Sequence, residues 1–296
     1  MNQPASGQVR LGLLSAFGAY LIWGLLPLFL KQVSFASPWE ILGQRVLWSI
    51  PAAAGAVALF GGFAAAFAAF REKGVLRALA LSSVLIAANW TIFVWAVAND
   101  RVIEGSLAYF LSPLITVAVG VLVFKEQLKG LQLPALIVAA IGVILQGVAI
   151  GHVPWVSLSL CASWVAYGVI RKQAPVPAAA GLLAETAFLA VPAAVVLALL
   201  ARQGPGLAIA DSSAHAGLLV LLGPLTAAPL ILFALAARRV SFVALGVLQY
   251  VGPTLQLLTG LAYGESFGPL RAASFGLIWA GLAFFTWETV FAKARS

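Results

Sequence analysis

Long apolar blocks separated by short polar breaks run along almost the whole chain. The blocks cover residues 11–30, 38–60, 76–98, 103–124, 130–150, 154–170, 179–201, 215–237, 240–262 and 268–291. A helix needs roughly 20 apolar residues to cross a bilayer, and most of these blocks come close to that length. The pattern therefore predicts an all-α integral membrane protein with ten transmembrane helices.

Composition agrees with lipid as the main solvent. Hydrophobic residues make up 62% of the chain and charged residues 9%, far from the roughly 25% charged content of a soluble domain. Ten spans would occupy about 200 positions, which leaves only short connections among the 296 residues. We expect no separate soluble domain.

The positive charges are distributed unevenly between alternate loops. One set of loops and termini holds twelve Lys and Arg residues, the other holds four, and Arg45 lies inside a span. Short basic loops stay in the cytoplasm during insertion, so both termini are predicted to be cytoplasmic in a multi-pass protein of the bacterial inner (plasma) membrane. A nucleic-acid partner is not expected, because these charges form no single patch or stripe.

The two halves of the chain share aromatic and glycine positions. The shared positions are Tyr20, Trp23 and Gly24 in the first half and Trp164, Tyr167 and Gly168 in the second. With five spans in each half, the two copies would have opposite orientations, as in many secondary transporters. We therefore expect inverted five-helix repeats over residues 1–150 and 151–296.

A short amphipathic stretch follows the second span. Phe63, Phe67 and Phe70 precede basic residues, a pattern that suits a helix in the headgroup layer. A frayed end of the second span is an equal alternative.

Two ionisable residues inside predicted spans are candidates for transport chemistry. Arg45 lies within the second span, where a charge costs about 2.5 to 3.5 kcal/mol unless it is paired or hydrated. It belongs either to a substrate pathway or to a buried ion pair that locks two helices. Glu185, near the start of the seventh span, could bind and release a proton, since burial and a nearby Arg shift a carboxyl pKa in opposite directions.

Amide and aromatic side chains add to the polar candidates. Asn89 and Gln249 lie in the third and ninth spans, where an amide either faces a cavity or makes interhelical hydrogen bonds. Tyr109 and Tyr250 lie away from span ends, so they suit the wall of a cavity for an amphipathic solute, although ordinary helix packing is the alternative.

The sequence lacks the residues that several kinds of chemistry require. Both histidines, His152 and His215, fall in predicted loops, so no intramembrane metal site is expected. The chain has no phosphate-binding loop motif, and we expect no cofactor, no catalytic residues and no enzyme activity.

Specific strings resemble the RarD group of the EamA-type drug/metabolite transporters. They include Glu40-Ile-Leu-Gly-Gln-Arg45, Asn89-Trp-Thr-Ile-Phe-Val-Trp, Glu104-Gly-Ser-Leu-Ala-Tyr-Phe and Leu245-Gly-Val-Leu-Gln-Tyr. The resemblance implies a ten-helix permease of two inverted halves, with a central cavity formed mainly by the first, third, fourth, sixth, eighth and ninth helices. Members of the group often carry His immediately before the Arg of the second span, and this chain has Gln44 there.

Together these features predict a secondary transporter that moves a small organic metabolite or drug-like solute by alternating access, outward across the inner membrane. Its substrate-binding candidates are Arg45, Asn89, Tyr109, Gln249 and Tyr250, with Glu185 as a coupling acid and protons as a coupling ion. The lipid bilayer is its other partner, and a homo-oligomer is left open. Two rivals remain at this point, a non-transporting scaffold or regulatory subunit and a membrane enzyme acting on lipid-linked substrates.

Overall fold

The computed structural model describes residues 6–60, 62–99, 101–148, 151–202, 206–262 and 268–291. Within these ranges all regular structure is helical: α1 (Ser6–Gln32), α2 (Pro38–Phe60), α3 (Phe63–Arg71), α4 (Lys73–Ala98), α5 (Val102–Leu122), α6 (Gln132–Val148), α7 (Trp155–Gln173), α8 (Ala178–Arg202), the 3-10 turn η1 (Ala208–Ala210), α9 (Ser213–Ala237), α10 (Phe242–Gln249), α11 (Val251–Ala262) and α12 (Pro269–Phe291). The predicted repeat boundary at residue 150, and the basic residues Lys293 and Arg295, lie outside the described residues.

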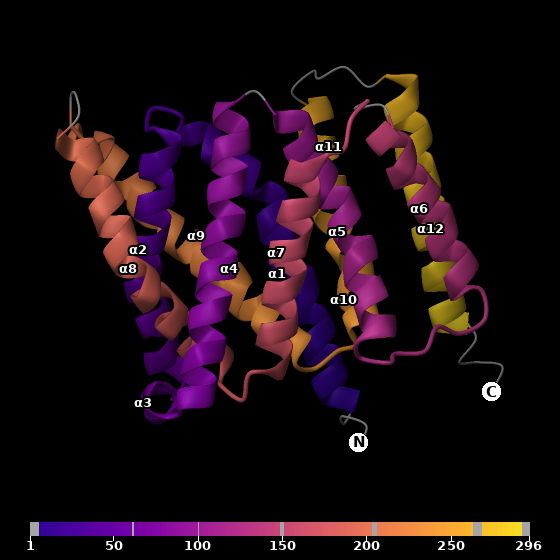
Figure 1. Ribbon diagram of the computed structural model, residues 1–296, viewed down its shortest axis with the longest axis horizontal. Helices are drawn as coiled ribbons and strands as arrows, with labels where there is room; N and C mark the ends of the chain where they lie inside the picture. The colour runs from indigo at the N-terminus through magenta and orange to yellow at the C-terminus, as the bar shows by residue number, and fades with distance from the viewer. Residues whose placement is uncertain are drawn as a thin grey trace.

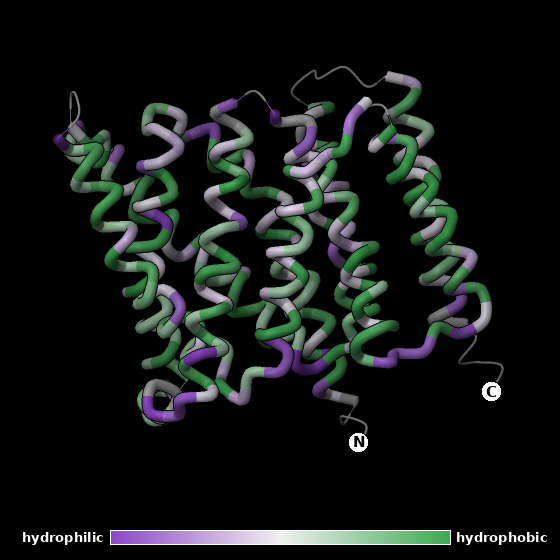
Figure 2. Tube along the Cα trace, in the orientation of Figure 1, coloured by the Kyte–Doolittle hydropathy of each residue, from purple (hydrophilic) through white to green (hydrophobic). Residues whose placement is uncertain are grey.

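The long helices stand side by side and cross the same slab (Figure 1). The first turn of α1 and the last turn of α12 lie at one edge, which we call the terminal edge; the other is the opposite edge. Hydrophilic positions gather near both edges, and hydrophobic positions fill much of the length between them (Figure 2). This layering is what a bilayer imposes, because lipid offers no hydrogen bonds to polar groups.

Seven helices among the described residues are long and apolar enough to cross a membrane: Gly7–Gln32, Pro38–Phe60, Lys73–Ala96, Glu104–Leu122, Ala178–Arg202, Ser213–Ala237 and Phe242–Ala262. The chain is therefore a multi-pass membrane protein. Helix α6, at 17 residues, is shorter, and α7 ends with Arg171 and Lys172 in its last turn. Crossing by α6, α7 and α12 stays a prediction.

Close approach between α2 and α9 depends on a glycine. A Cβ atom on Gly223 of α9 would lie 2.2 Å from the carbonyl oxygen of Trp48 in α2. The Ser49 hydroxyl also donates to the Gly223 carbonyl across this contact, at 3.3 Å. Residue 223 therefore has no room for a side chain, and the two helices meet backbone to backbone.

The predicted span 240–262 is broken into two helices. Helix α10 ends at Gln249 and α11 begins at Val251, with Tyr250 in a turn between them. Proline has no N–H, so Pro253 cannot bond the carbonyl four residues earlier, which belongs to Gln249. The break lies next to that carbonyl, although α1, α2, α5, α8 and α9 continue through prolines of their own.

The stretch after the second span forms a separate short helix, α3, at the terminal edge (Figure 1). Phe63 and Phe67 are exposed, and the Arg71 guanidinium carbon lies 4.5 Å from the centre of the Phe67 ring. Exposed aromatic rings beside a basic group suit the headgroup layer. Of the two sequence alternatives, the structure has the independent helix rather than a frayed end.

Candidate functional site

Arg45 lies where four helices converge. It projects from α2, and its Nε donates to the Thr226 hydroxyl of α9 at 3.1 Å. Its guanidinium carbon lies 4.9 Å from the centre of the Trp90 ring of α4. Tyr109 of α5 is within electrostatic range of the same charge. One hydrogen bond, one aromatic face and one nearby hydroxyl therefore surround the guanidinium.

No carboxylate among the described residues forms an ion pair with Arg45. Its two terminal nitrogens make no hydrogen bond within the described chain, and neither is sealed from solvent. The buried ion pair that was the alternative for this residue is absent there. An arginine in a membrane helix that keeps its outer nitrogens open can bind an incoming group.

Tyr109 lies near the same guanidinium. It is 38% exposed although it lies well inside α5. Its ring meets that of Phe93, on α4, edge to face with 6.1 Å between ring centres. The structure thus places Tyr109 near Arg45; that the two form one solute site stays a prediction.

The Asn89 amide is engaged with a neighbouring helix. Its Nδ2 donates to the Leu160 carbonyl at 2.8 Å and to the Ser163 hydroxyl at 3.0 Å, both on α7. Asn89 directly precedes Trp90, which faces Arg45, so it lies beside the site. Its hydrogen-bond donors tie α4 to α7 in this conformation.

Gln249 and Tyr250 lie at the break between α10 and α11 and face α5. The side-chain amide oxygen of Gln249 accepts from the Thr116 hydroxyl at 3.3 Å, and the Tyr250 hydroxyl donates to the Phe110 backbone carbonyl at 3.3 Å. Tyr250 is packed in a hydrophobic cluster with Phe275. No contact of either residue with Arg45 occurs in the described chain.

Glu185 belongs to a separate buried cluster. Its Oε1 lies 3.5 Å from Nη1 of Arg171, its Oε2 accepts from the Tyr167 hydroxyl at 3.4 Å, and the Ser82 hydroxyl also donates to it. Arg171 in turn donates to the Ala178 carbonyl at 2.9 Å. The cluster joins α4, α7 and α8.

Sequence reasoning missed the partners of both charged candidates. Thr226 was not among the candidate residues, although it lies one turn beyond Gly223 on the face of α9 that meets α2. Arg171 was assigned to a polar break, whereas it is 2% exposed in the last turn of α7. Its position four residues after Tyr167 places both on one helix face, and that spacing was the available signal.

Aromatic rings close the bundle between this site and the terminal edge. Trp23 of α1 meets Trp164 of α7 edge to face, with 5.1 Å between ring centres, and Phe233 of α9 lies 4.8 Å from Trp164. These rings pack with a large buried cluster that continues to Phe242 at the start of α10. The terminal edge is thus filled by side chains in this part of the bundle.

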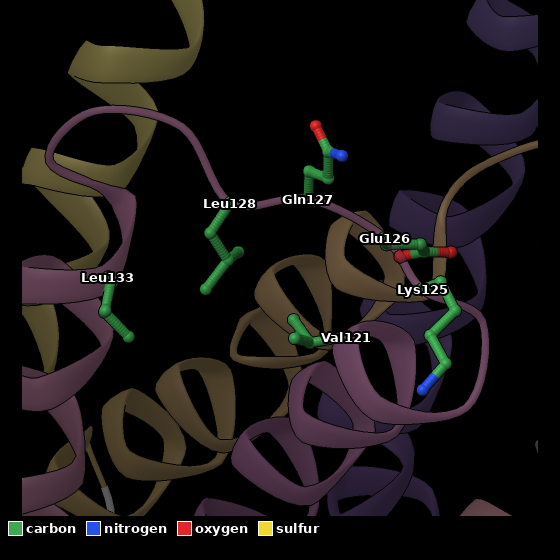
Figure 3. A pocket seen from close by; sticks show the side chains of 6 residues that line it. All are labelled: Val121, Lys125, Glu126, Gln127, Leu128 and Leu133. Carbon is green, nitrogen blue, oxygen red and sulfur yellow. The ribbon is translucent and has the colours of Figure 1, made fainter.

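A groove of about 470 Å³ lies at the end of α5, along the connection to α6. Figure 3 shows its lining: Val121, Lys125, Glu126, Gln127, Leu128 and Leu133. The Glu126 carboxylate accepts from the backbone N–H groups of Phe242 and Val243 at 2.6 and 2.7 Å, so its charge caps α10. This groove contains none of the predicted site residues.

Metal-binding side chains do not gather in the described part of the chain. Within it, no three His, Cys, Asp or Glu residues are placed to hold an ion. His152 lies near Glu104 at 3.8 Å, and His215 lies near Asp211 at 3.7 Å. Each histidine therefore meets a single carboxylate.

Comparison with known proteins agrees with this architecture. Residues 10–147 match the EamA-like transporter family. The chain is 37% identical to protein RarD of Streptomyces exfoliatus, over 99% of this chain and 93% of that protein, and 35% identical to protein RarD of Escherichia coli, over 98% of each. It is also 40% identical to an uncharacterized transporter of Pseudomonas aeruginosa, over 96% of each.

A solved crystal structure shares the fold. It superimposes with a TM-score of 0.70 over 93% of this chain and 97% of that one, at 21% sequence identity. The similarity to the RarD proteins covers almost the whole chain at 35 to 37% identity. Together with the family match and the apolar helices, it supports a membrane transporter. The chain belongs to the RarD-type EamA permeases of the drug/metabolite transporter superfamily.

Proposed function

We propose that this protein is a secondary transporter that moves a small organic metabolite or drug-like solute outward across the bacterial inner membrane by alternating access. The observation that carries the proposal is Arg45, a charge inside a membrane helix with open terminal nitrogens and no carboxylate partner among the described residues. Such a group is costly in a bundle that binds nothing. The transporter relatives support the same class of function.

The proposed architecture has ten crossings in two inverted five-helix repeats, residues 1–150 and 151–296. Helix packing supports it. Helix α1 packs on α9 as α7 packs on α4, α2 packs on α9 as α8 packs on α4, and α1 packs on α11 as α7 packs on α5. A two-fold axis in the membrane plane would exchange the members of each pair, which is the geometry that lets two halves rock about one site.

Both termini are proposed to be cytoplasmic. The basic residues of alternate loops favour this orientation, and both ends of the helical bundle lie at the terminal edge (Figure 1). Reporter fusions at the two ends and at the α4–α5 connection would test it. A periplasmic signal from either end contradicts the orientation.

Arg45 and Tyr109 are proposed as the centre of the solute site, with Asn89, Gln249 and Tyr250 lining the route. The last three bond groups on neighbouring helices in this conformation. In the proposal they exchange those partners for solute or water as the halves move. Their variants should therefore change the rate of transport more than the affinity.

Glu185 is proposed to couple transport to protons. Its carboxylate bridges α4, α7 and α8 through Ser82, Tyr167 and Arg171. Protonation would neutralise Glu185 and weaken the ion pair with Arg171, so the proton could change the packing of these helices. Glu185→Gln should abolish flux driven by a pH gradient while leaving solute exchange measurable. Glu72→Gln, at an exposed position after α3, is the matched control.

Flux into liposomes tests the function as a whole. Purified protein is reconstituted and challenged with metabolite and drug panels, with and without an imposed proton gradient. We expect flux of at least one solute class, lost in Arg45→Gln. Absence of flux for every class under both conditions would defeat the proposal.

A further inference from the structure

Three described acidic residues in or near the membrane helices already have partners. Glu185 pairs with Arg171, and Glu104 with Arg101 at 2.7 Å. Glu40 accepts from the backbone N–H groups of Ala208 and Ile209 at 3.1 Å each. Arg45, by contrast, is a half-buried cation whose counter-charge the described chain does not supply.

The groups around Arg45 suit an anion and oppose a cation. Thr226 accepts one hydrogen bond from Nε, and Trp90 covers one face of the guanidinium. The two outer nitrogens are the fork that binds a carboxylate through two parallel hydrogen bonds. A cationic group at the same place would meet a like charge in a low-dielectric site.

The remaining walls are aromatic. Trp90 stacks on the cation, and Tyr109 and Phe93 form an edge-to-face pair beside it. Trp90, Trp23 and Trp164 all pack against one buried cluster. Ring faces of this kind favour a flat, apolar body through offset or edge-to-face contacts.

We propose that the transported solute is an organic anion, a carboxylate joined to a flat aromatic body, with the carboxylate bound by the Arg45 guanidinium. This inference rests on the proposed transport function and names the substrate class of the same site. The anion supplies the counter-charge that the described chain does not offer to Arg45. The aromatic body lies against Trp90 and Tyr109.

Charge-matched probes on one ring frame test the substrate class. Indole-3-acetate, indole-3-acetamide and tryptamine carry a carboxylate, an amide and an ammonium on the same ring; benzoate, benzamide and benzylamine repeat the comparison on a smaller ring. Thermal stabilisation of the purified protein is measured against the concentration of each compound, because a ligand that binds the folded state raises its stability. We expect the carboxylates to stabilise the protein at concentrations about tenfold lower than the amides. A charge-assisted hydrogen bond contributes more binding free energy than a neutral one, and the difference corresponds to about a tenfold change in affinity. The ammonium compounds should not stabilise.

Variants of Arg45 assign the preference to this residue. Arg45→Gln should remove the difference between carboxylate and amide, and Arg45→Lys should keep a smaller difference because the charge stays and the fork is lost. Arg10→Gln removes an exposed charge at the start of α1 and should leave the wild-type order unchanged. Any of three results overturns the proposal. The three compounds on one ring could stabilise the protein equally, the preference for carboxylates could persist in Arg45→Gln, or no carboxylate could have an effect.

Liposome flux separates failure of this inference from failure of the proposed function. Flux of amides or ammonium compounds without flux of carboxylates overturns the anion inference and leaves the transporter standing. Flux of carboxylates that Arg45→Gln abolishes supports both. No flux of any charge class defeats the transport function itself.

Discussion

At the scale of single residues, Glu185 and Arg171 illustrate how two buried charges depend on one another. Each is at most 2% exposed, and Arg171 has Nε and Nη1 without hydrogen-bond partners apart from its ion pair. A Cβ on Gly181 would lie 2.0 Å from Nη1, so glycine at this position gives the guanidinium its space. Removing one member of such a pair leaves the other charge uncompensated.

A double-mutant cycle measures that dependence. Glu185→Gln alone should lower the free energy of unfolding by about 3 to 5 kcal/mol, the usual cost of leaving a buried charge unpaired. The double variant Glu185→Gln with Arg171→Met should be more stable than the single one, because no charge is then stranded. Unfolding by SDS in mixed micelles gives these values. A double variant that loses the sum of both single effects would mean that the two residues act independently.

The charged candidates could be found from sequence because charges are rare in these spans, but their surroundings could not. Arg45 is conspicuous between Gln44 and Val46. Its bond with Thr226 joins residues 181 positions apart, and no local pattern encodes a pairing at that distance. The open terminal nitrogens depend on all four helices and follow only from the packed structure.

At the scale of elements, the α2–α9 contact depends on Gly223. Gly223→Ala would place a methyl group against the Trp48 carbonyl, a backbone atom that cannot rotate away. We expect a loss of about 1 to 3 kcal/mol, typical of overpacking. Gly217→Ala, on the same helix with nothing within 4 Å of its Cβ, should be neutral or slightly stabilising because alanine favours helix. Equal behaviour of the two variants in SDS unfolding would contradict the close contact.

Helix α10 has a second dependence, on a residue outside it. The Glu126 carboxylate accepts two hydrogen bonds from the first turn of α10, where the helix dipole also favours negative charge. Glu126→Ala should cost about 1 to 2 kcal/mol, in the range measured for lost N-terminal caps. Glu72→Ala is an exposed control. The prediction fails if both variants unfold at the same SDS concentration as the wild type.

Helix positions were predictable to within a few residues because the start and end of each apolar run set the start and end of its helix. The block 38–60 coincides with α2, and 179–201 lies inside α8. The exception is 240–262, which reads as one apolar run yet divides at Tyr250. Hydropathy does not register this break, and Pro253 alone could not predict it, because other helices continue through a proline.

At the scale of the whole molecule, the charge distribution predicts an even number of membrane crossings, and that number stays a prediction. The first and last helices begin and end at the same edge (Figure 1), which is what alternating basic loops require. The number of crossings is less accessible from composition: seven helices in the described part of the chain meet the length and hydropathy expected of spans, whereas α6 has only 17 residues and α7 ends with two basic residues. Neighbouring helices, and not lipid alone, can surround such segments.

In the proposed alternating access the terminal edge must open, and Lys172 makes contacts that such an opening would break. Its Nζ donates to the carbonyls of Ala237 and Val240 at 3.0 and 2.8 Å, which ties the end of α7 to the α9–α10 connection. The same ammonium lies 5.3 Å from the centre of the Phe124 ring. Lys172 therefore holds together elements that belong to the start and the middle of the second half.

Lys172→Met should keep the apolar packing and remove both hydrogen bonds, so the terminal edge should open more often. The variant Ala236→Cys, at a position that is fully buried here, reports opening. Its thiol should react with a maleimide added from the terminal edge at a rate that rises as the edge opens. We expect an increase of about tenfold in that rate, because a charge-assisted bond contributes about 1.5 to 3 kcal/mol. Lys129→Met, exposed on the α5–α6 connection, should leave the rate unchanged. If Lys172→Met also leaves it unchanged, the edge does not open along the α7–α9 contact, and the two halves must part elsewhere.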